Sequence, residues 1–233
     1  MAVVTGGGSG TGLACASALS ARGTSCVLVG RRQERLQAAA TTLDAPATVM
    51  AADLTEPGTP DRIIEETLAA HRRIDVIVHS AGVFDKAPAS EVTADHWQRV
   101  LDINLNVVMA LTRAGWEALS DSGGQIVLIS SIAAVQPFAG NAAYAASKGG
   151  LNALGEVLRL EGRDCGIRVI TLSPAQIDTE LWDGKAPESV RARMMPAAGV
   201  GELVADLVGT DRRIDIDPII IRPVHDPWVE PEP

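Results

Sequence analysis

Short apolar runs alternate with longer amphipathic stretches along almost the whole chain. The short runs are rich in Val and Ile, which is typical of buried strands. They cover residues 2–5, 25–29, 48–51, 75–79, 125–130, 168–173 and 216–221. The stretches between them carry apolar residues at helical spacing and cover residues 11–22, 32–43, 59–72, 94–119, 142–164 and 188–208. Six strand–helix alternations predict a single doubly wound α/β domain, with a seven-stranded, mainly parallel sheet flanked by helices on both faces.

The predicted domain covers residues 1–223, and no internal repeat or linker interrupts it. Residues 224–233 form a tail rich in proline and acidic residues. We expect Trp228 to hold this tail against its own subunit or a neighbouring one. Thr93 is predicted to cap the helix that follows it, because a threonine oxygen accepts from the free N–H groups at a helix start.

Composition and charge exclude several classes of protein. Apolar residues make up 46% of the 233 residues and charged residues 21%, an ordinary globular balance. The net charge of −9 opposes nonspecific binding to nucleic acid or to an anionic membrane. Cys15, Cys26 and Cys165 are widely spaced and odd in number, which indicates reduced core thiols rather than a metal site or disulfides. Met1 leads directly into a strand and no apolar run reaches about 18 residues, so a cytoplasmic location is expected.

The first predicted strand leads into a glycine-rich loop, Thr5-Gly-Gly-Gly-Ser-Gly-Thr-Gly12, and a helical pattern follows directly. Such glycines permit a tight turn, close approach of the backbone to a pyrophosphate, and close packing of helix against strand. A glycine-rich string alone also fits a flexible turn, but the strand before it and the helix after it favour dinucleotide binding. The loop residues predicted to contact the dinucleotide are Gly6, Gly8, Ser9, Gly10, Thr11 and Gly12.

The end of the second predicted strand bears on which dinucleotide binds. NAD-binding units usually place an acidic residue there for the ribose 2′-hydroxyl, but this chain has Gly30 and no carboxylate before Glu34. Arg31 and Arg32 open the next helix, where the helix dipole disfavours cations, and a bound 2′-phosphate would resolve that conflict. The alternative is that both arginines are solvated and pair with Glu34. The pattern favours NADP(H), with NAD(H) as the alternative cofactor.

A candidate acid–base pair lies in the helical pattern at residues 142–164. Tyr144 and Lys148 are four residues apart, so they share one face of the helix among side chains too small to cover them. An unperturbed tyrosine titrates near ~10. A cation about 4 Å away at an effective dielectric near 20 would contribute roughly 4 kcal/mol, enough to lower the phenol pKa by up to ~3. Taken alone, however, this spacing is more typical of a packed ring and a solvated amine.

Together these motifs resemble the short-chain dehydrogenase/reductase family over nearly the full length of the chain. The family's Thr-Gly-x-x-x-Gly-x-Gly loop matches Thr5 to Gly12, and its Tyr-x-x-x-Lys pair matches Tyr144 and Lys148. Its catalytic serine, thirteen residues before the tyrosine, matches Ser131, and its helix asparagine matches Asn104. Further residues that the resemblance assigns to the cofactor are Asp53, Leu54, Ala81, Gly82, Pro174, Ile177 and Thr179.

The resemblance implies an oxidoreductase that interconverts a carbonyl and a secondary alcohol. Tyr144 would give its proton to the carbonyl oxygen during reduction, while Lys148 would lower the tyrosine pKa and bind the nicotinamide ribose. Ser131 would donate a hydrogen bond to the substrate oxygen. Asn104 would position a water molecule that links Lys148 to solvent, and the cofactor would carry the hydride.

The chain departs from the family pattern at several places. His79-Ser-Ala-Gly replaces Asn-Asn-Ala-Gly, and we expect His79 to be a satisfied core or ribose-side residue rather than a catalyst. Ala175 replaces a glycine, which would cost roughly 1 kcal/mol if the position required positive φ. Thr11 stands where the family usually has an aliphatic residue. The strand at residues 216–221 resembles that of the family's NADP-dependent hydroxy-acid and serine-type dehydrogenases.

The substrate is expected to lie among loops that follow the strands and under the segment around residues 180–208. Arg191 and Arg193 in that segment fit a carboxylate, although paired surface arginines are more often solvated. A small ketone, β-keto acid or aldehyde is therefore predicted. The residues expected to border the pocket are Phe84, Gln136, Phe138, Asn141, Trp182 and Met194.

Two other functions and the state of assembly remain to be weighed. A dinucleotide-binding regulator without catalysis would be expected to lack Tyr144, Lys148 or Ser131, and all three are present. An epimerase or dehydratase on the same fold would hold NAD tightly, which the arginine pair at 31–32 opposes. A homodimer or homotetramer is predicted because the patterns at 94–119 and 142–164 carry apolar residues on more than one face: Val107, Val108, Leu111, Leu151, Leu154 and Leu158.

Overall fold

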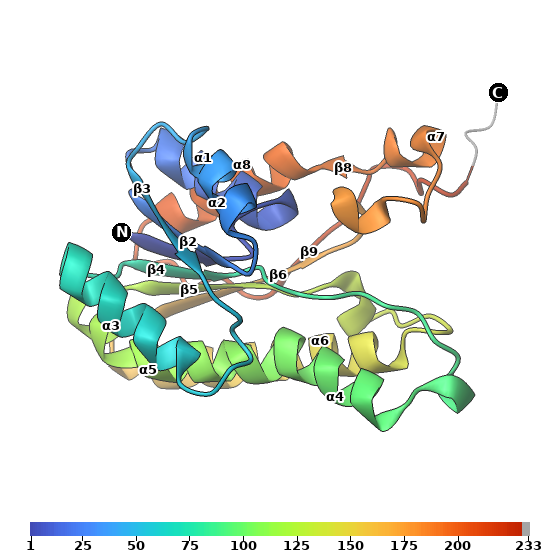
Figure 1. Ribbon diagram of the computed structural model, residues 1–233, viewed down its shortest axis with the longest axis horizontal. Coiled ribbons are helices and arrows are strands. Elements are labelled where there is room, and N and C mark those ends of the chain that lie inside the picture. The colour runs from blue at the N-terminus through green and yellow to red at the C-terminus, as the bar shows by residue number, and fades with distance from the viewer. Residues whose placement is uncertain (230–233) are drawn as a thin grey trace.

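The computed structural model describes residues 1–229, which form a sheet between two layers of helices (Figure 1). Seven strands lie in the order β3-β2-β1-β4-β5-β6-β9, and every neighbouring pair is parallel. The predicted α/β class and seven-stranded sheet are therefore confirmed, and the sheet is parallel throughout. The strands are β1 (Ala2–Thr5), β2 (Cys26–Gly30), β3 (Ala47–Ala51), β4 (Val76–His79), β5 (Gln125–Ile129), β6 (Arg168–Pro174) and β9 (Ile219–Ile221).

Helices cover both faces of the sheet, so the central strands are buried on both sides and consist of nearly continuous apolar residues. One face carries α1 (Gly10–Ala21), α2 (Gln33–Ala40) and α8 (Ala197–Gly209). The other face carries α3 (Thr59–His71), α4 (Ala94–Leu101), α5 (Val107–Ser122) and α6 (Ala142–Asp164).

Two apolar cores result, one on each face of the sheet. Successive side chains of a strand point to opposite faces. In β1, Val4 therefore packs in the core with Cys15 of α1, whereas Val3 packs in the other core with Ile63 of α3. Burial raises the pKa of the Cys15 thiol to about 12 and that of Cys26 to about 11, so both remain neutral core residues, as predicted. Cys165 is only partly buried.

The structure corrects several predicted boundaries. The predicted helix at 94–119 is two helices joined by a π-helical turn, Asp102–Asn106. The predicted helix at 188–208 is divided into α7 (Glu188–Arg191) and α8, because the short strand β8 (Met195–Pro196) intervenes and pairs with β7 (Ile177–Asp178). Pro196, in β8, also disfavours helix at the residue before it. The last strand begins at Ile219 instead of residue 216, because Pro218 has no backbone N–H to donate to a neighbouring strand.

The residues that suggested a partner surface belong to the chain's own interior. Val107, Val108, Leu111, Leu151 and Leu158 are buried, because α5 and α6 pack against neighbouring helices as well as the sheet. Leu154 is only partly buried. The large apolar side chains that α5 and α6 do expose are Met109, Val157 and Leu160.

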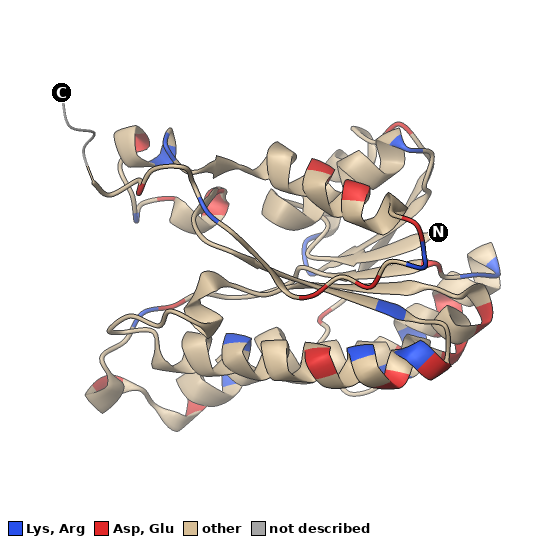
Figure 2. Ribbon diagram, turned by 180° about the vertical axis from the view of Figure 1, so that it is seen from behind, with Lys and Arg blue, Asp and Glu red and all other residues tan. Residues whose placement is uncertain are grey.

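Smaller features follow the sequence closely. The Thr93 side chain accepts a hydrogen bond from the backbone N–H of His96 at 3.1 Å and so caps α4, as predicted. Ala175 does not adopt positive φ, since Arg72 alone among the non-glycine residues 1–229 does so, and the strain considered for this position is absent. Figure 2 shows acidic and basic residues interspersed along the helices. No helix within residues 1–229 has the length and apolar character needed to cross a membrane.

His79, at the end of β4, is buried, and its Nε2 lies 3.0 Å from the hydroxyl of Thr112 on α5. It is thus a satisfied core residue, one of the two placements predicted for it. Burial lowers its pKa to about 3. Below pH 6.5, the ordinary pKa of a histidine, His79 is protonated in the unfolded chain but stays neutral in the folded one. The free energy of unfolding therefore falls as the pH falls.

The substitution His79→Asn tests this linkage. Between pH 7 and pH 5 the wild-type protein should lose about 2 kcal/mol more unfolding free energy than the variant, because only its unfolded state gains a proton at this position. Urea unfolding at both pH values measures the difference. Equal losses in the two proteins would show that His79 is not held neutral by the fold.

Candidate active site

The functional site lies where the order of the strands reverses, between β1 and β4. The carboxyl ends of parallel strands open a crevice at such a point. Two adjoining clefts occupy this edge, one of about 310 Å³ and one of about 200 Å³. They share Gly6, Ser9, Ala81, Gly82 and Val83, so they run together along the loop after β1. We call them the catalytic cleft and the arginine cleft, after the side chains that each contains.

The glycine loop has the conformation that its sequence predicts. Gly6 and Gly10 adopt positive φ of 68° and 53°, which side chains rarely tolerate. A Cβ on Gly12 would collide with the carbonyl oxygen of Gly6, so α1 can approach the loop only with glycine there. The Thr5 hydroxyl donates to the carbonyl oxygen of Val78 at 3.3 Å and accepts from the backbone N–H of Ala81 at 3.1 Å. This side chain therefore fixes the loop to the end of β4.

The arginine cleft holds the residues predicted for the far end of the dinucleotide. Arg31 and Arg32 line it together with Asp53 and Leu54. The pKa of Asp53 is lowered, chiefly by hydrogen bonds from Thr55 and to a smaller extent by the Arg31 cation. A third arginine, Arg35 in the first turn of α2, also lines this cleft. The sequence analysis did not predict it.

Arg35 also connects the two clefts. Its guanidinium forms an ion pair with Glu180, which follows β7 and lines the catalytic cleft. The two residues are 145 positions apart in sequence, and both are more than 40% exposed. No periodicity or motif in the sequence indicates such a contact.

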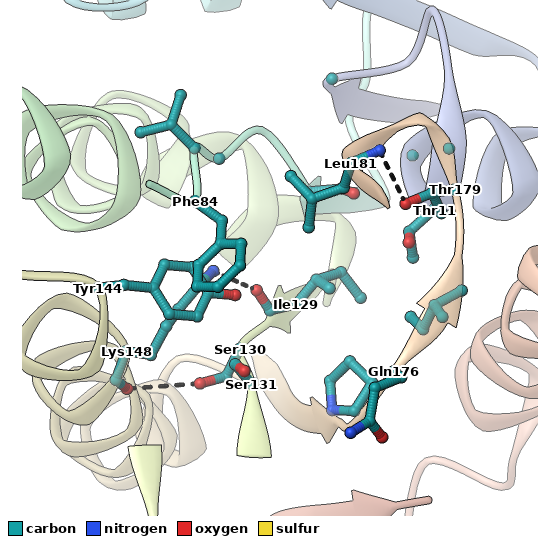
Figure 3. A pocket seen from close by; sticks show the side chains of 18 of the residues that line it. Thr11, Phe84, Ile129, Ser130, Ser131, Tyr144, Lys148, Gln176, Thr179 and Leu181 are labelled. Atoms are coloured by element: carbon teal, nitrogen blue, oxygen red, sulfur yellow. Dashed lines mark hydrogen bonds between the residues drawn. The ribbon is translucent and has the colours of Figure 1, made fainter. Parts of the chain in front are cut away.

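Tyr144 and Lys148 lie on the first two turns of α6 and both line the catalytic cleft (Figure 3). The Lys148 ammonium donates a hydrogen bond to the carbonyl oxygen of Ile129, at the end of β5, at 2.8 Å. Its nitrogen lies 5.8 Å from the centre of the Tyr144 ring. The helical spacing therefore does bring the two side chains together, and the sheet holds the amine in place.

The acidities of this pair differ from the prediction made from their spacing. Burial raises the pKa of the Tyr144 phenol, and hydrogen bonding with Ser131 offsets this only in part. Burial also lowers the pKa of Lys148 to about 8. The loss of water around the two side chains favours the neutral phenol and the neutral amine. This effect outweighs the attraction between a phenolate and an ammonium group, which would favour the charged forms. In the protein alone the phenol is a weaker acid than a free tyrosine.

Asn104 lies in the π-helical turn and is buried beneath Lys148 rather than lining either cleft. Its side chain exchanges two hydrogen bonds with the backbone of Val83, at 2.9 and 3.0 Å, and donates a third to the Ser147 hydroxyl. A Cβ placed on Gly82 would lie 3.2 Å from the Asn104 amide oxygen and 3.9 Å from the Lys148 nitrogen. Both polar atoms therefore converge on one glycine of the cleft wall.

The opposite wall of the catalytic cleft comes from β5, β6 and the segment after them. Ser131 follows β5, and its hydroxyl accepts a hydrogen bond from the backbone N–H of Ala133 at 3.1 Å. Every residue predicted to contact the cofactor lines one of the two clefts. Those in the catalytic cleft that have not yet been placed are Thr11, Pro174, Ile177 and Thr179.

Aromatic side chains close the outer end of the catalytic cleft. The Phe84 ring lies at the centre of this aromatic cluster. Its centroid is 4.8 Å from that of the Tyr144 ring and 6.2 Å from those of Phe138 and Trp182. Trp182 packs in turn on Trp228, so the tail as far as residue 229 is held by its own chain. Residues that line the cleft but that the sequence prediction omitted include Gln176 and Leu181.

Half of the residues predicted to border the substrate do not line the cleft. Gln136 accepts a hydrogen bond from Arg222. Asn141 is buried, and its side-chain oxygen accepts a hydrogen bond from the backbone N–H of Phe138. Met194 is buried as well. Gln136 and Asn141 lie within three residues of Phe138 in the sequence, but side-chain direction in a loop cannot be read from sequence.

The two arginines predicted for a substrate carboxylate are bound to other groups. Arg191 forms ion pairs with Asp178 at 2.7 Å and with Asp183 at 2.6 Å. Arg193 donates to the carbonyl oxygen of Val229. Arg191 is already paired with two aspartates and Arg193 is bound to the tail, so a carboxylate on the substrate needs another partner.

Comparison with known proteins agrees with this arrangement. A family model described as short chain dehydrogenase matches residues 1–189. The chain is 30% identical over 225 residues to an uncharacterised oxidoreductase of Staphylococcus epidermidis, with 96% of this chain and 97% of that protein covered. It is 28% identical to an uncharacterised oxidoreductase of Listeria monocytogenes, with 97% of each chain covered.

Solved structures show the same fold. An alcohol dehydrogenase from the archaeon Thermococcus sibiricus, complexed with 5-hydroxy-NADP, superposes with a TM-score of 0.89 at 22% identity, covering 99% of this chain and 98% of that one. A serine dehydrogenase complexed with NADP+ superposes with a TM-score of 0.88 at 24% identity, covering 96% and 94%. With its family match, its oxidoreductase relatives and its cleft, the chain belongs to the short-chain dehydrogenase/reductase family and is an oxidoreductase.

Proposed function

We propose that this oxidoreductase interconverts a carbonyl compound and a secondary alcohol by hydride transfer, with NADP(H) as its cofactor and Tyr144 as its acid–base group. The observation that carries this proposal is the convergence of Tyr144, Lys148 and Ser131 on one cleft that continues along the glycine loop. A dinucleotide binder without catalysis would have no need of a buried phenol and amine in that cleft.

The clefts fit a dinucleotide in shape and in chemistry. A Cβ on Gly6 would crowd the Ala81 backbone, and one on Gly12 would collide with the Gly6 carbonyl oxygen. These glycines therefore let the loop turn tightly at the start of α1, where backbone N–H groups can meet a pyrophosphate. Ala81 and Gly82 would flank its sugars, and Thr179 and Ile177 would meet the nicotinamide end. When bound, the cofactor supplies the hydride, and its oxidised ring adds a positive charge to the cleft.

The phenol and its neighbours would move the proton. Tyr144 gives its proton to the carbonyl oxygen during reduction and takes it back during oxidation. Ser131 donates a hydrogen bond to the same oxygen, where negative charge develops. Because burial raises the pKa of Tyr144, a second positive charge beside Lys148 is needed to bring the phenol into a useful range. Asn104, held by the Val83 backbone, would position a water molecule that links Lys148 to solvent.

The preference for NADP(H) rests on the charge of the arginine cleft. Arg31, Arg32 and Arg35 all line it, and Asp53 is the acidic residue there. Guanidinium groups bind phosphate with strong, directed hydrogen bonds. The alcohol dehydrogenase and the serine dehydrogenase of the same fold were solved with NADP-type cofactors, which supports the same preference here.

Assembly and location complete the proposal. We propose that the exposed apolar residues Met109, Val157 and Leu160 on α5 and α6 pair this chain with further copies, giving a homodimer or homotetramer that acts in the cytoplasm on a small-molecule substrate, without nucleic-acid or membrane partners. Light scattering that finds only the monomer mass of 24.3 kDa would exclude this assembly.

The substitution Tyr144→Phe removes the acid–base group and keeps the ring. Turnover across a panel of ketones, aldehydes and alcohols should fall by about 10²–10⁴-fold, the usual contribution of a positioned acid or base. The affinity for NADPH, measured by fluorescence titration, should change by less than about twofold, since the ring still packs on Phe84. Retained turnover in the variant would remove Tyr144 from the mechanism.

The substitution Arg31→Ala tests the cofactor preference. It should raise the Kd for NADPH by about tenfold or more, because a charge-assisted bond to the 2′-phosphate is worth about 1.5–3 kcal/mol. The Kd for NADH should stay within about twofold. Arg62→Ala is the matched control, because Arg62 is exposed on α3 and pairs with Glu66 away from both clefts. Equal weakening of NADPH and NADH by Arg31→Ala would contradict the assignment.

A further inference from the structure

The lysines of this chain are confined to the surroundings of the active site. The sequence contains only Lys86, Lys148 and Lys185, and every other basic side chain apart from histidine is arginine. Lys148 belongs to the catalytic cleft, as described above. The remaining two lie on separate segments, Lys86 in the connection between β4 and α4 and Lys185 after the turn that contains Trp182. Their common position in space is not suggested by any sequence motif.

Both of these lysines lie against Phe84, which lines the cleft, although neither lysine lines it itself; we call the two the rim lysines. The Lys86 nitrogen lies 6.0 Å from the centre of the Phe84 ring and 5.1 Å from that of Phe138. The Lys185 nitrogen lies 5.7 Å from the Phe84 ring and donates to the Phe84 carbonyl oxygen at 3.3 Å. The same Phe84 ring packs on Tyr144 at 4.8 Å. Each ammonium group is therefore one aromatic ring away from the phenol.

The carboxylates near this rim are paired with arginines rather than with these lysines. Asp85 pairs with Arg99. Asp183 pairs with Arg191 at 2.6 Å. Lys185 lies near enough to Asp85 to help lower its pKa, but Arg99 is the main cause of that shift. Within residues 1–229, neither rim lysine has a carboxylate oxygen within 4.0 Å.

The rim lysines thus keep donors for a ligand. An ammonium group has three N–H donors, and Lys185 uses one of them on the Phe84 carbonyl. Cation–π contacts at exposed sites contribute only about 0.5–1 kcal/mol, and arginine is the more common partner for a ring.

We propose that Lys86 and Lys185 bind a carboxylate on the substrate, held across the Phe84 ring from the reacting carbonyl. This inference rests on the proposed function and narrows its substrate to an aldehyde or ketone with an apolar or aromatic body and a distal carboxylate. An α-keto acid does not meet this description, because its carboxylate would lie beside Tyr144 and Ser131, away from both lysines. Lys86 and Lys185 thus take the role that the sequence analysis expected for Arg191 and Arg193, binding of a substrate carboxylate.

Two closely related aldehydes, one charged and one neutral, test the proposal. In 4-formylbenzoate one aromatic ring separates the carbonyl from the carboxylate, and methyl 4-formylbenzoate is its neutral counterpart. The wild-type enzyme with NADPH should show a kcat/KM at least about tenfold higher for the acid than for the ester, corresponding to one charge-assisted bond. The acid 2-formylbenzoate, whose carboxylate adjoins the carbonyl, should show no such advantage.

Substitution of the rim lysines should remove this selectivity. In the double variant Lys86→Gln, Lys185→Gln, the advantage of the acid over the ester should fall to less than about twofold, mainly through a higher KM for the acid, while the ester is reduced as before. The variant Lys86→Arg should keep most of the advantage. Arg62→Gln, which removes an equal charge far from the cleft, should leave it unchanged.

The outcomes separate this proposal from the proposed function. Reduction of the ester with no preference for the acid, or a preference that survives in the double variant, overturns the rim site and leaves the oxidoreductase mechanism in place. If neither aldehyde is reduced, calorimetry with the unreactive pair 4-methylbenzoate and 4-methylbenzamide, in the presence of NADP+, tests the rim directly. Preferential binding of the benzoate that depends on both lysines supports the site, and equal binding of the two overturns it.

Discussion

Burial of a phenol and an amine in one cleft is the constraint on which the site depends. Desolvation raises the pKa of Tyr144 and lowers that of Lys148, so the protein by itself favours the neutral form of each group more than water does. The carbonyl oxygen of Ile129 holds the amine in place without neutralising it. We propose that the oxidised cofactor adds a positive charge beside Tyr144. The pKa of the phenol would then fall only when this cofactor is bound.

The fold holds this pair between rigid elements. The amine rests on the end of β5, while the π-helical turn directs Asn104 toward Gly82 and Lys148. Irregular helical turns of this kind are common at functional sites, because they redirect a side chain without ending the helix. Thr5 fixes the glycine loop to the same edge of the sheet, so the loop and the Tyr144–Lys148 pair are held by the same strands.

Sequence reasoning predicted what local patterns and family motifs determine. The strands, the glycine loop and the Tyr144–Lys148 face all follow from periodicity and spacing, and parallel strands bring their carboxyl ends to one edge. It missed what tertiary contacts determine: the Arg35–Glu180 pair, the lysines over Phe84, and the burial of Val107 and Leu158 inside the chain. It also misjudged the phenol, because spacing reveals a neighbouring charge but not the loss of water.

Tyr144 is the only tyrosine in the chain. Titration of the phenolate absorbance band therefore reports on this residue alone. The midpoint should lie above ~10 for the protein by itself and should shift well toward neutral pH when NADP+ is bound. Equal midpoints with and without NADP+, or a midpoint already below ~10 in the protein alone, would contradict this prediction.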